Sequence, residues 1–417
     1  MTIMRAWFGI PLWKRVLGGL FAGVTLGLLW PDAAPWIAFV GEVFMRLIRM
    51  LVVPVVFITI ASGVTSLGDP KRLGAIGGRT VGLFAATTVI AVLLGMSIAL
   101  LVEPGKGAQL AGVTAHPLGA AKSVHDQLVG IVPTNVIEAL VQGDMLAIIF
   151  FALLVGIGTT LAREDGRPLA ALLQSAASML FRVVELVMEV TPFGVAALIA
   201  NAIATNGTAV FVNIGWLAGC VLIGAVAQML LVHSAMLAFV ARVSPLGFFR
   251  GIMDALVVAF STASSSATLP VALRVATEYL GLPRPIVSTV LPVGASIGKD
   301  GTAMYVGLLS VFALQALGIT PTIEMLGMML LTGALAAFGT APIPSASLFM
   351  LAAVLAAVGV SAEQTALVVG LVLPFDRLLD MTRTVPSASA NLTIATLVAR
   401  WEGTEPLAEE AAARQPG

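Results

Sequence analysis

Long hydrophobic runs alternate with short polar segments along almost the whole chain. A helix that crosses a bilayer needs about 20 predominantly apolar residues. Eight of the runs predict such spans, near residues 16–30, 36–66, 78–102, 128–160, 170–203, 209–241, 285–315 and 362–399. The pattern therefore predicts an all-α polytopic membrane protein with eight transmembrane helices.

Two further apolar stretches, 251–273 and 325–358, are interrupted by small polar residues and proline. The first contains the run Ser261–Pro270, and the second contains Gly339–Ser347. Backbone that is not helical is tolerated at membrane depth only inside the protein or beside water. Interrupted segments in corresponding positions of two halves indicate re-entrant helical hairpins around a binding site. The alternative is a pair of kinked helices without a site.

The charges of the loops indicate a topology. If the N-terminus is cytoplasmic, the opposite side receives only Lys106 and Lys122. The cytoplasmic side then receives Arg5, Lys14, Arg15, Lys71, Arg72, Arg79, Arg163, Arg167, Arg242, Arg250, Arg274, Arg284 and Arg400. The positive-inside rule predicts this asymmetry for eight spans with both termini in the cytoplasm. The hairpins then have opposite orientations, which indicates inverted repeats at about 209–315 and 325–399.

Composition narrows the class of protein. Of the 417 residues, 59% are apolar and 11% charged, whereas soluble domains have roughly 45–50% and about 25%. Lys and Arg together number 22, as do Asp and Glu, so there is no basic surplus for nucleic acid. The three histidines lack the spacing of metal ligands. We expect no metal site, no cofactor and no nucleic-acid partner.

Ionisable residues nevertheless fall inside the predicted spans, where each costs about 2.5–3.5 kcal/mol on insertion scales. Lys299 and Asp300 interrupt the span near 285–315. In the last span, polar residues recur every three or four positions and so share one face of a helix; they are Asp376, Asp380, Arg383, Thr384, Ser387 and Asn391. This pattern favours a substrate site. The alternative is an internal network of ion pairs that only fixes the helix register.

Four motifs carry a resemblance to a known family: Ser264–Pro270, Asp300–Ala303, Gly339–Pro344 and Asp380–Thr384. Together with Arg46–Pro54 and Ile131–Asn135, they make nearly the whole chain similar to the glutamate/aspartate transporter family, also called the dicarboxylate/amino acid:cation symporters. The resemblance implies a homotrimer in a lipid bilayer that works as an elevator-type transporter, not an enzyme. It places the protein in the inner (plasma) membrane.

The resemblance also implies a division into domains. Scaffold helices 1 and 2 would occupy residues 1–70, and scaffold helices 4 and 5, with an extracellular loop, residues 104–208. The transport domain would comprise helix 3 at 71–103 and the segment 209–402, which holds helix 6, hairpin 1, helix 7, hairpin 2 and helix 8. A disordered cytoplasmic tail would follow at 403–417.

Matching the family motifs residue by residue implies a substrate site. Arg383 would hold the side-chain carboxylate of the substrate, with support from Thr302, and Asp380 would hold its α-ammonium. A guanidinium is the natural bidentate partner of a carboxylate. A carboxylate in the site pairs with the ammonium of an amino acid, whereas a plain dicarboxylic acid has no ammonium to pair with it. An acidic amino acid is therefore favoured. The other implied substrate residues are Ser264, Ser265, Ser266, Ile343, Ser347, Thr384 and Ser387.

The chain departs from the family at positions that bind sodium in coupled members. Gly298-Lys299 stands where the family has Asn-Met, Ser387 and Asn391 stand for Asn and Asp, and Phe84 replaces an aromatic hydroxyl. Lys299 would place an ammonium where a sodium ion would sit, and two close cations repel each other. The positions concerned are Lys299, Asp300, Asp376, Gly294, Gly298, Asn391, Thr87, Thr88 and Phe84. The alternative is that Lys299 points away and that sodium still binds backbone carbonyls.

These observations predict a secondary active transporter of acidic amino acids, aspartate or glutamate, that is sodium-independent, with Lys299 in place of a bound sodium. A buried lysine can exchange a proton, so that transport would be proton-coupled, or it can keep its charge, so that transport would be uncoupled. The alternative within transport is a sodium- or proton-coupled symporter of C4-dicarboxylates or neutral amino acids. A serine hydrolase that uses Ser264–Ser266 lacks a base at a motif-like spacing, and paired charges around a carboxylate-sized site argue against an ion channel.

Overall fold

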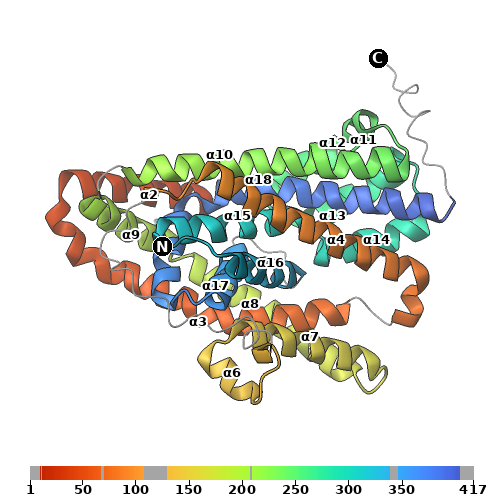
Figure 1. Cartoon of the computed structure of the whole chain (residues 1–417), viewed down its shortest axis with the longest axis horizontal. Coiled ribbons are helices and arrows are strands. Elements are labelled where there is room, and N and C mark those ends of the chain that lie inside the picture. The colour runs from red at the N-terminus through yellow and green to blue at the C-terminus, as the bar shows by residue number, and fades with distance from the viewer. Residues whose placement is uncertain are drawn as a thin grey trace.

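Every element of the described chain is a helix in the computed structural model, as the sequence predicts. The structure describes residues 10, 12–66, 70–107, 129–206, 209–338 and 346–403. Most of the long helices run roughly along the longest axis of the molecule (Figure 1).

The first half of the chain forms one group of packed helices around the long helix α3. Helix α2 packs along α9, and α3 packs on α7, α8 and α9. Gly19 and Gly23 permit the close contact between α2 and α9. A Cβ atom at Gly19 would lie 2.2 Å from the carbonyl oxygen of Pro192, and one at Gly23 would lie 2.5 Å from that of Ala196. Small residues four apart let membrane helices approach closely in this way. The elements are α2 (Leu12–Leu29), η1 (Pro31–Ala33), α3 (Ala34–Ser66), α4 (Pro70–Val102), α6 (Val136–Gln142), α7 (Met145–Leu161), α8 (Arg167–Met188) and α9 (Thr191–Asn206).

The second half surrounds the 40-residue helix α18, which contacts most of the other elements there. Helix α4 joins this half because it packs along α15. The elements are α10 (Ala209–Ala227), the π-helices η2 (Gln228–His233) and η3 (Met236–Ala241), α11 (Pro245–Gly251), α12 (Met253–Thr262), α13 (Ser265–Glu278), α14 (Arg284–Ile297), α15 (Asp300–Ala316), α16 (Ile323–Phe338), α17 (Ala346–Ala357) and α18 (Ala362–Trp401). The division into scaffold and transport domains stays a prediction.

Both interrupted stretches contain two helices that pack against each other. In the first, α12 ends at Thr262 and is followed by Ala263, whose φ of 51° lies in the left-handed region. Ser264 then caps helix α13 by accepting a hydrogen bond from the backbone N–H of Ala267. In the second, α16 packs on α17, and the predicted tip with Ile343 lies outside the described residues.

Two described helical segments are long and apolar enough to cross a membrane by themselves, Ile76–Val102 and Val212–Ala241. Helices α11 and α12, bent by 57°, count as a third if they form one span. Other predicted spans are divided: the one near 285–315 consists of α14 and α15, and the one near 170–203 of α8 and α9. The chain has the helices of a membrane protein, and the number of eight spans stays a prediction.

Arg15 is buried although it carries a charge. It lies inside α2 and is only 6% exposed, and its place on the cytoplasmic side stays a prediction. Its guanidinium forms a two-pronged ion pair with the carboxylate of Glu189, near the end of α8, in which Nη2 donates to Oε1 over 3.0 Å. The residue is buried because a carboxylate from another helix supplies the partner that a buried charge needs.

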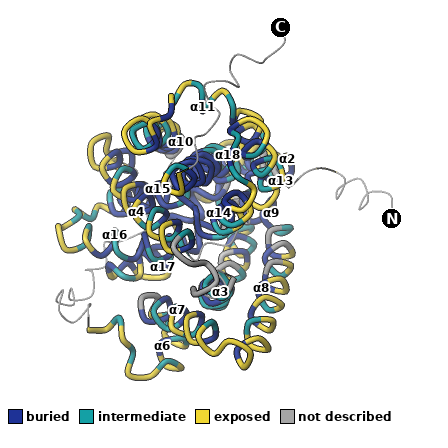
Figure 2. Tube along the Cα trace, turned by 90° about the vertical axis from the view of Figure 1, so that its right-hand side faces the viewer, coloured by how far each residue is buried: buried dark blue, intermediate teal, exposed yellow. Residues whose placement is uncertain are grey.

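The buried hydrophobic side chains form two clusters that meet along α18. The larger contains Leu379 and earlier residues of α18, and the smaller begins on α18 at Ala388. Figure 2 shows α15 and α18 as largely buried tubes in the middle of the molecule, with α6, α7 and α8 more exposed. The polar stripe predicted for the last span extends across the junction of the two clusters, from Asp376 to Asn391.

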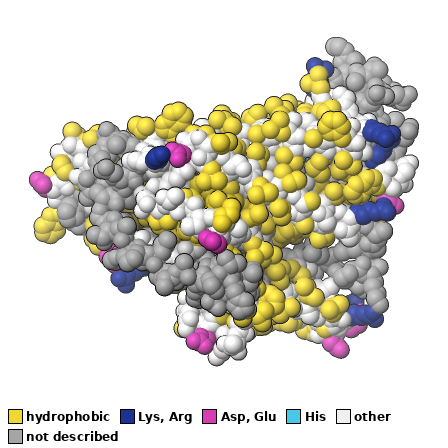
Figure 3. Space-filling view, viewed as in Figure 1, with side chains coloured by type: hydrophobic (Ala, Val, Ile, Leu, Met, Phe, Trp, Pro, Cys, Tyr) yellow, Lys and Arg dark blue, Asp and Glu magenta, His cyan; other side chains and the backbone are white. Residues whose placement is uncertain are grey.

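The outer surface is strongly hydrophobic. In Figure 3 hydrophobic side chains cover much of the visible face, and Lys and Arg side chains gather mainly toward the end where α11 and α12 lie. Large apolar residues such as Trp36, Phe39 and Phe239 are more than 60% exposed. A contiguous surface of this kind is typical of a protein that lies in lipid.

Candidate functional site

Helix α18 supplies a buried polar face. Residues three or four apart lie on one side of a helix, and all six members of the predicted stripe are at most 7% exposed. They are held there because α18 is enclosed by α10, α12, α14 and α15. The structure brings together Asp376, Asp380 and Arg383 and places Ser387 and Asn391 further along the same side, toward α14 and α15.

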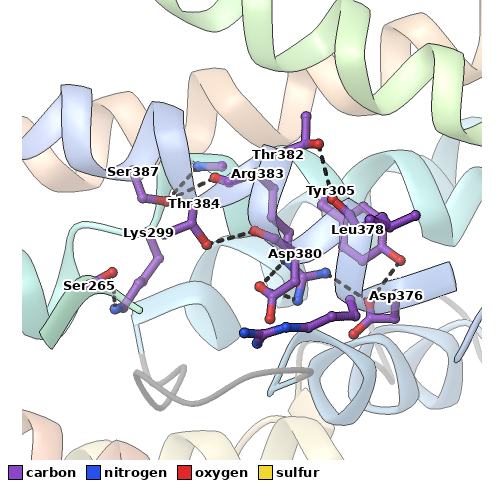
Figure 4. A network of polar contacts seen from close by, with 12 residues as sticks. Ser265, Lys299, Tyr305, Asp376, Leu378, Asp380, Thr382, Arg383, Thr384 and Ser387 are labelled. Carbon is purple, nitrogen blue, oxygen red and sulfur yellow. Dashed lines mark hydrogen bonds and ion pairs between the residues drawn. The ribbon is translucent and has the colours of Figure 1, made fainter. Parts of the chain in front are cut away.

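Arg383 is the centre of an ion-pair cluster (Figure 4). Its Nη1 donates to Oδ1 of Asp376 over 3.1 Å, and its Nη2 lies 2.9 Å from Oδ1 of Asp380. The guanidinium carbon stacks 4.3 Å above the ring of Tyr305, whose hydroxyl donates to Asp376 over 3.2 Å. Oδ2 of Asp376 is buried without a hydrogen-bond partner. The site therefore holds one cation between two carboxylates and one buried carboxylate oxygen that has no hydrogen-bond partner. This arrangement suits a ligand that carries both a positive and a negative charge.

Lys299 is buried, and its ammonium donates hydrogen bonds to two uncharged oxygen atoms. Its Nζ donates to Oγ of Ser265 over 2.9 Å and to the backbone oxygen of Ala295 over 2.8 Å. Asp380 lies close enough for an electrostatic interaction with the ammonium of Lys299. The lysine precedes the first residue of α15, and its side chain points toward Ser265 at the start of α13 (Figure 4).

Asp300 turns to the opposite side. It begins α15, where the helix dipole favours a negative charge. Its Oδ1 accepts from the hydroxyl of Thr87 over 2.9 Å, and its Oδ2 accepts from Nε2 of Gln228 over 3.1 Å and lies 3.2 Å from Nε2 of His233. The other ring nitrogen of His233 lies 2.9 Å from the hydroxyl of Ser389. These groups come from four elements, α15, α4, η2 and α18.

Four residues of these clusters are not among the predicted site residues: Tyr305, Gln228, His233 and Ser389. Gln228 and His233 could have been found, because each is a strongly polar residue inside a long apolar run. Such residues are rarely tolerated there without a role. Tyr305 and Ser389 carry no such signal, since hydroxyls are common in membrane helices.

The remaining predicted residues lie around these groups. Phe84 is buried against Gly298, where a Cβ atom would lie 2.4 Å from its ring and 2.1 Å from Oδ1 of Asn391. Gly294 meets the same two side chains, and Oδ1 of Asn391 is buried without a partner. A cavity large enough for about one water molecule lies between Ser265, Ala295 and Asn391.

The predicted hydroxyl residues have different surroundings. Ser266 is exposed, whereas Thr302 is half-buried. The hydroxyl of Thr384 donates to the backbone oxygen of Asp380 over 2.7 Å. The hydroxyls of Thr88 and Ser347 are buried without a described partner. Of the predicted substrate residues, only Ile343 cannot be placed, since it lies outside the described chain.

Gly301 permits α15 to touch the backbone of α18. An alanine Cβ at this position would lie 1.6 Å from the carbonyl oxygen of Arg383. We expect Gly301→Ala to destabilise the protein by about 1–3 kcal/mol, because one of the two helices must move. The check is the thermal unfolding midpoint of the detergent-solubilised protein. The control is Gly219→Ala on α10, where nothing lies within 4 Å, so that this variant should be as stable as the wild type or slightly more stable. Equal midpoints for both variants would contradict the close approach.

An all-helical chain with a lipid-compatible surface, broken helices and buried paired charges has the features of a membrane transporter. The chain matches the sodium:dicarboxylate symporter family over residues 12–401. It belongs to this family, whose members are transporters and not enzymes, and the predicted resemblance to glutamate/aspartate transporters is confirmed.

Its relatives include transporters of two substrate classes. The chain is 34% identical over 411 residues to a proton/sodium-glutamate symport protein of Bacillus subtilis (strain 168), with 96% of this chain and 94% of the relative covered. It is 33% identical over 418 residues to a proton/glutamate-aspartate symporter of Escherichia coli (strain K12), with 93% and 92% covered. It is 31% identical over 409 residues to a C4-dicarboxylate transport protein of Brucella anthropi, with 94% and 90% covered.

Proposed function

We propose that the protein is a secondary active transporter of acidic amino acids, aspartate or glutamate, and that it works without sodium. The observation that carries the choice of substrate is the buried cluster in which Arg383 is paired with Asp376 and Asp380. Relatives named as glutamate and glutamate-aspartate symporters support the same class.

The cluster suits a zwitterionic substrate with an additional carboxylate. The side-chain carboxylate of aspartate would bind the guanidinium of Arg383, with Thr302 nearby. The α-ammonium of the substrate would then pair with Asp380 in place of that guanidinium. Both ends of the opened ion pair would then be compensated, so neither charge would stay buried and unpaired. The α-carboxylate would be held at the hairpin tips by Ser264, Ser265, Ser266, Ile343 and Ser347, with Thr384 and Ser387 beside the site on α18.

Lys299 supports independence from sodium. Its ammonium already lies against two oxygen atoms, the hydroxyl of Ser265 and the backbone oxygen of Ala295, and hard oxygen ligands are what a small cation requires. A sodium ion placed close by would be repelled by this fixed charge. Asn391, which stands where the family has a carboxylate, adds no negative charge to offset that repulsion.

The architecture proposed with this function rests on the family. It is a homotrimer in the inner membrane with both termini in the cytoplasm. Scaffold helices lie at 1–70 and 104–208, and an elevator-like transport domain lies at 71–103 and 209–402. The ionisable residues around Arg383 would travel with this domain.

The test is uptake of labelled aspartate into proteoliposomes that contain no sodium. We expect uptake, and counterflow against unlabelled aspartate, at rates within about twofold in choline and in sodium. Addition of an inside-alkaline pH gradient separates proton coupling, in which aspartate accumulates, from uncoupled transport, in which it only equilibrates. If counterflow is absent both in choline and in sodium, the proposal that the protein transports aspartate is wrong.

A second candidate function, transport of C4-dicarboxylates, is favoured by the relative from Brucella anthropi. Succinate has no ammonium, so it would leave Asp380 without a partner once Arg383 binds the ligand. We therefore expect unlabelled succinate to compete at least tenfold less well than aspartate in the same assay. Equal competition would favour the dicarboxylate function.

A further inference from the structure

The short helix α11 lies at the end of a long apolar segment. The segment Val212–Ala241 is long and apolar enough to cross a membrane, and it ends immediately before Arg242. At Arg242 the backbone enters the left-handed region, with a φ of 55°, and Ser244 then caps α11 by accepting a hydrogen bond from the N–H of Gly247. Helix α11 meets α12 with a bend of 57°. The chain thus changes direction twice where the apolar segment gives way to polar residues.

The exposed face of α11 is both apolar and basic. Leu246 and Arg250 are four residues apart, so they share one face of the helix, and both are exposed. Phe239, before α11, and Met253, after it, are also more than half exposed. Apolar and basic side chains on one helical surface are typical of the boundary between acyl chains and lipid headgroups.

Three exposed arginines surround this face. Arg242 precedes α11, Arg250 lies in its last turn, and Arg284 is the first residue of α14. The loop between α13 and α14 packs on α11, because a Cβ atom at Gly251 would lie 3.5 Å from Cδ2 of Leu280. Figure 3 shows Lys and Arg side chains gathering toward the end where α11 and α12 lie. The three guanidinium groups therefore belong to one end of the molecule.

The positive charge at this end exceeds the negative charge. Residues 242–297 contain four arginines and two acidic residues, Asp254 and Glu278. The carboxylate of Asp254 is already paired, since it accepts from Nη2 of Arg274 over 3.1 Å. The other three arginines form no ion pair with a carboxylate of the described chain. Guanidinium groups bind phosphate through two parallel hydrogen bonds, so three of them without an ion pair can accept such a group.

We propose that this surface binds the headgroup of an anionic phospholipid. The surface, called the α11 rim below, consists of Arg242, Arg250 and Arg284 with Phe239, Leu246 and Met253. The guanidinium groups would hold the phosphate and the negative headgroup, as basic residues beside a membrane attract anionic lipids, and the apolar side chains would lie along the acyl chains. A free phosphate ion would use the arginines but not the exposed apolar side chains, which favours a lipid.

The test is the thermal unfolding midpoint of the full-length protein in a nonionic detergent, with added phosphatidylglycerol or phosphatidylcholine. A ligand that binds only the folded state raises this midpoint, and we expect phosphatidylglycerol to raise that of the wild type by about 3 °C more than phosphatidylcholine does. The variant Arg242→Gln/Arg250→Gln should reduce this difference to about 1 °C or less. The matched control is Arg163→Gln/Arg167→Gln, which removes two exposed arginines from a loop with two acidic residues and should keep the wild-type difference.

Each variant is compared with its own midpoint in phosphatidylcholine. If the arginines of the α11 rim only stabilise the fold, or only orient the chain during insertion, the difference caused by phosphatidylglycerol would stay as in the wild type, and the inference would be overturned. Equal stabilisation by sodium phosphate would indicate a site for a free anion and would overturn it too, as would a wild type that responds alike to both lipids. A double variant that does not fold is replaced by Arg284→Gln, which should lower the difference by about half; an unchanged difference there is equally contrary.

Discussion

Replacement of Arg383 by alanine is expected to weaken aspartate and glutamate binding at least a hundredfold. Arg383 is the only buried guanidinium of the described second half, and its charge lies between two carboxylates. Without it the substrate carboxylate would have no cation and would face Asp376 and Asp380, so that attraction becomes repulsion. A hundredfold loss corresponds to about 2.8 kcal/mol, within the range of a charge-assisted, two-pronged interaction. Calorimetric titration with aspartate measures the effect.

The variant also needs a test of its fold, because removal of one partner leaves buried carboxylates uncompensated. Binding of a neutral amino acid such as serine supplies it, since Asp380 remains available for an ammonium. The matched control is Arg377→Ala on the same helix; Arg377 is only half-buried and donates over 3.4 Å to the backbone oxygen of Thr262. Unchanged aspartate affinity in Arg383→Ala would refute the assignment of the substrate site.

Substitution of Lys299 by methionine, the residue that the family pattern has there, is expected to weaken aspartate binding about tenfold in choline. The ammonium compensates part of the negative charge in the buried site and holds hairpin 1 through Ser265. Sodium should not restore affinity in this variant, because Asn391 still lacks the carboxylate charge, and Ser387 the amide oxygen, of the family pattern. Restoration is expected only when Ser387→Asn and Asn391→Asp are added.

The control for this experiment is Lys106→Met, which removes an exposed lysine whose ion pair with Glu103 lies on the surface. It should leave aspartate affinity unchanged. A wild-type protein that binds aspartate at least tenfold more tightly in sodium than in choline would overturn the role of Lys299 as a fixed cation. That gain corresponds to about 1.4 kcal/mol.

The buried polar stripe could be predicted from the sequence because α18 is one uninterrupted helix. A period of three to four residues then fixes which side chains share a face, without knowledge of the neighbouring helices. The break before Asp300 was predictable for a similar reason, since Gly298 and two adjacent charges cannot continue an apolar span. Both interpretations depend on local chemistry alone.

The directions of Lys299 and Asp300 could not be predicted in this way. Adjacent residues at a helix start point to different sides, and the side that each takes depends on partners far along the chain. Lys299 meets Ser265, 34 residues away, and Asp300 meets Thr87, 213 residues away. The contact with His233 also requires a π-helix, whose i→i+5 pattern no hydrophobic period of 3.6 reveals. Tertiary packing decides these positions.

The ion pair between Arg15 and Glu189 has a consequence for biogenesis. The two residues are separated by 174 positions, so at about 5–20 residues per second the ribosome needs roughly 9–35 seconds to supply the carboxylate after the guanidinium. During that interval Glu189 is not yet available to Arg15, which lies near the start of α2. The link between α2 and the end of α8 can therefore form only after both helices have been synthesised, and it is one of the late contacts of this half of the chain.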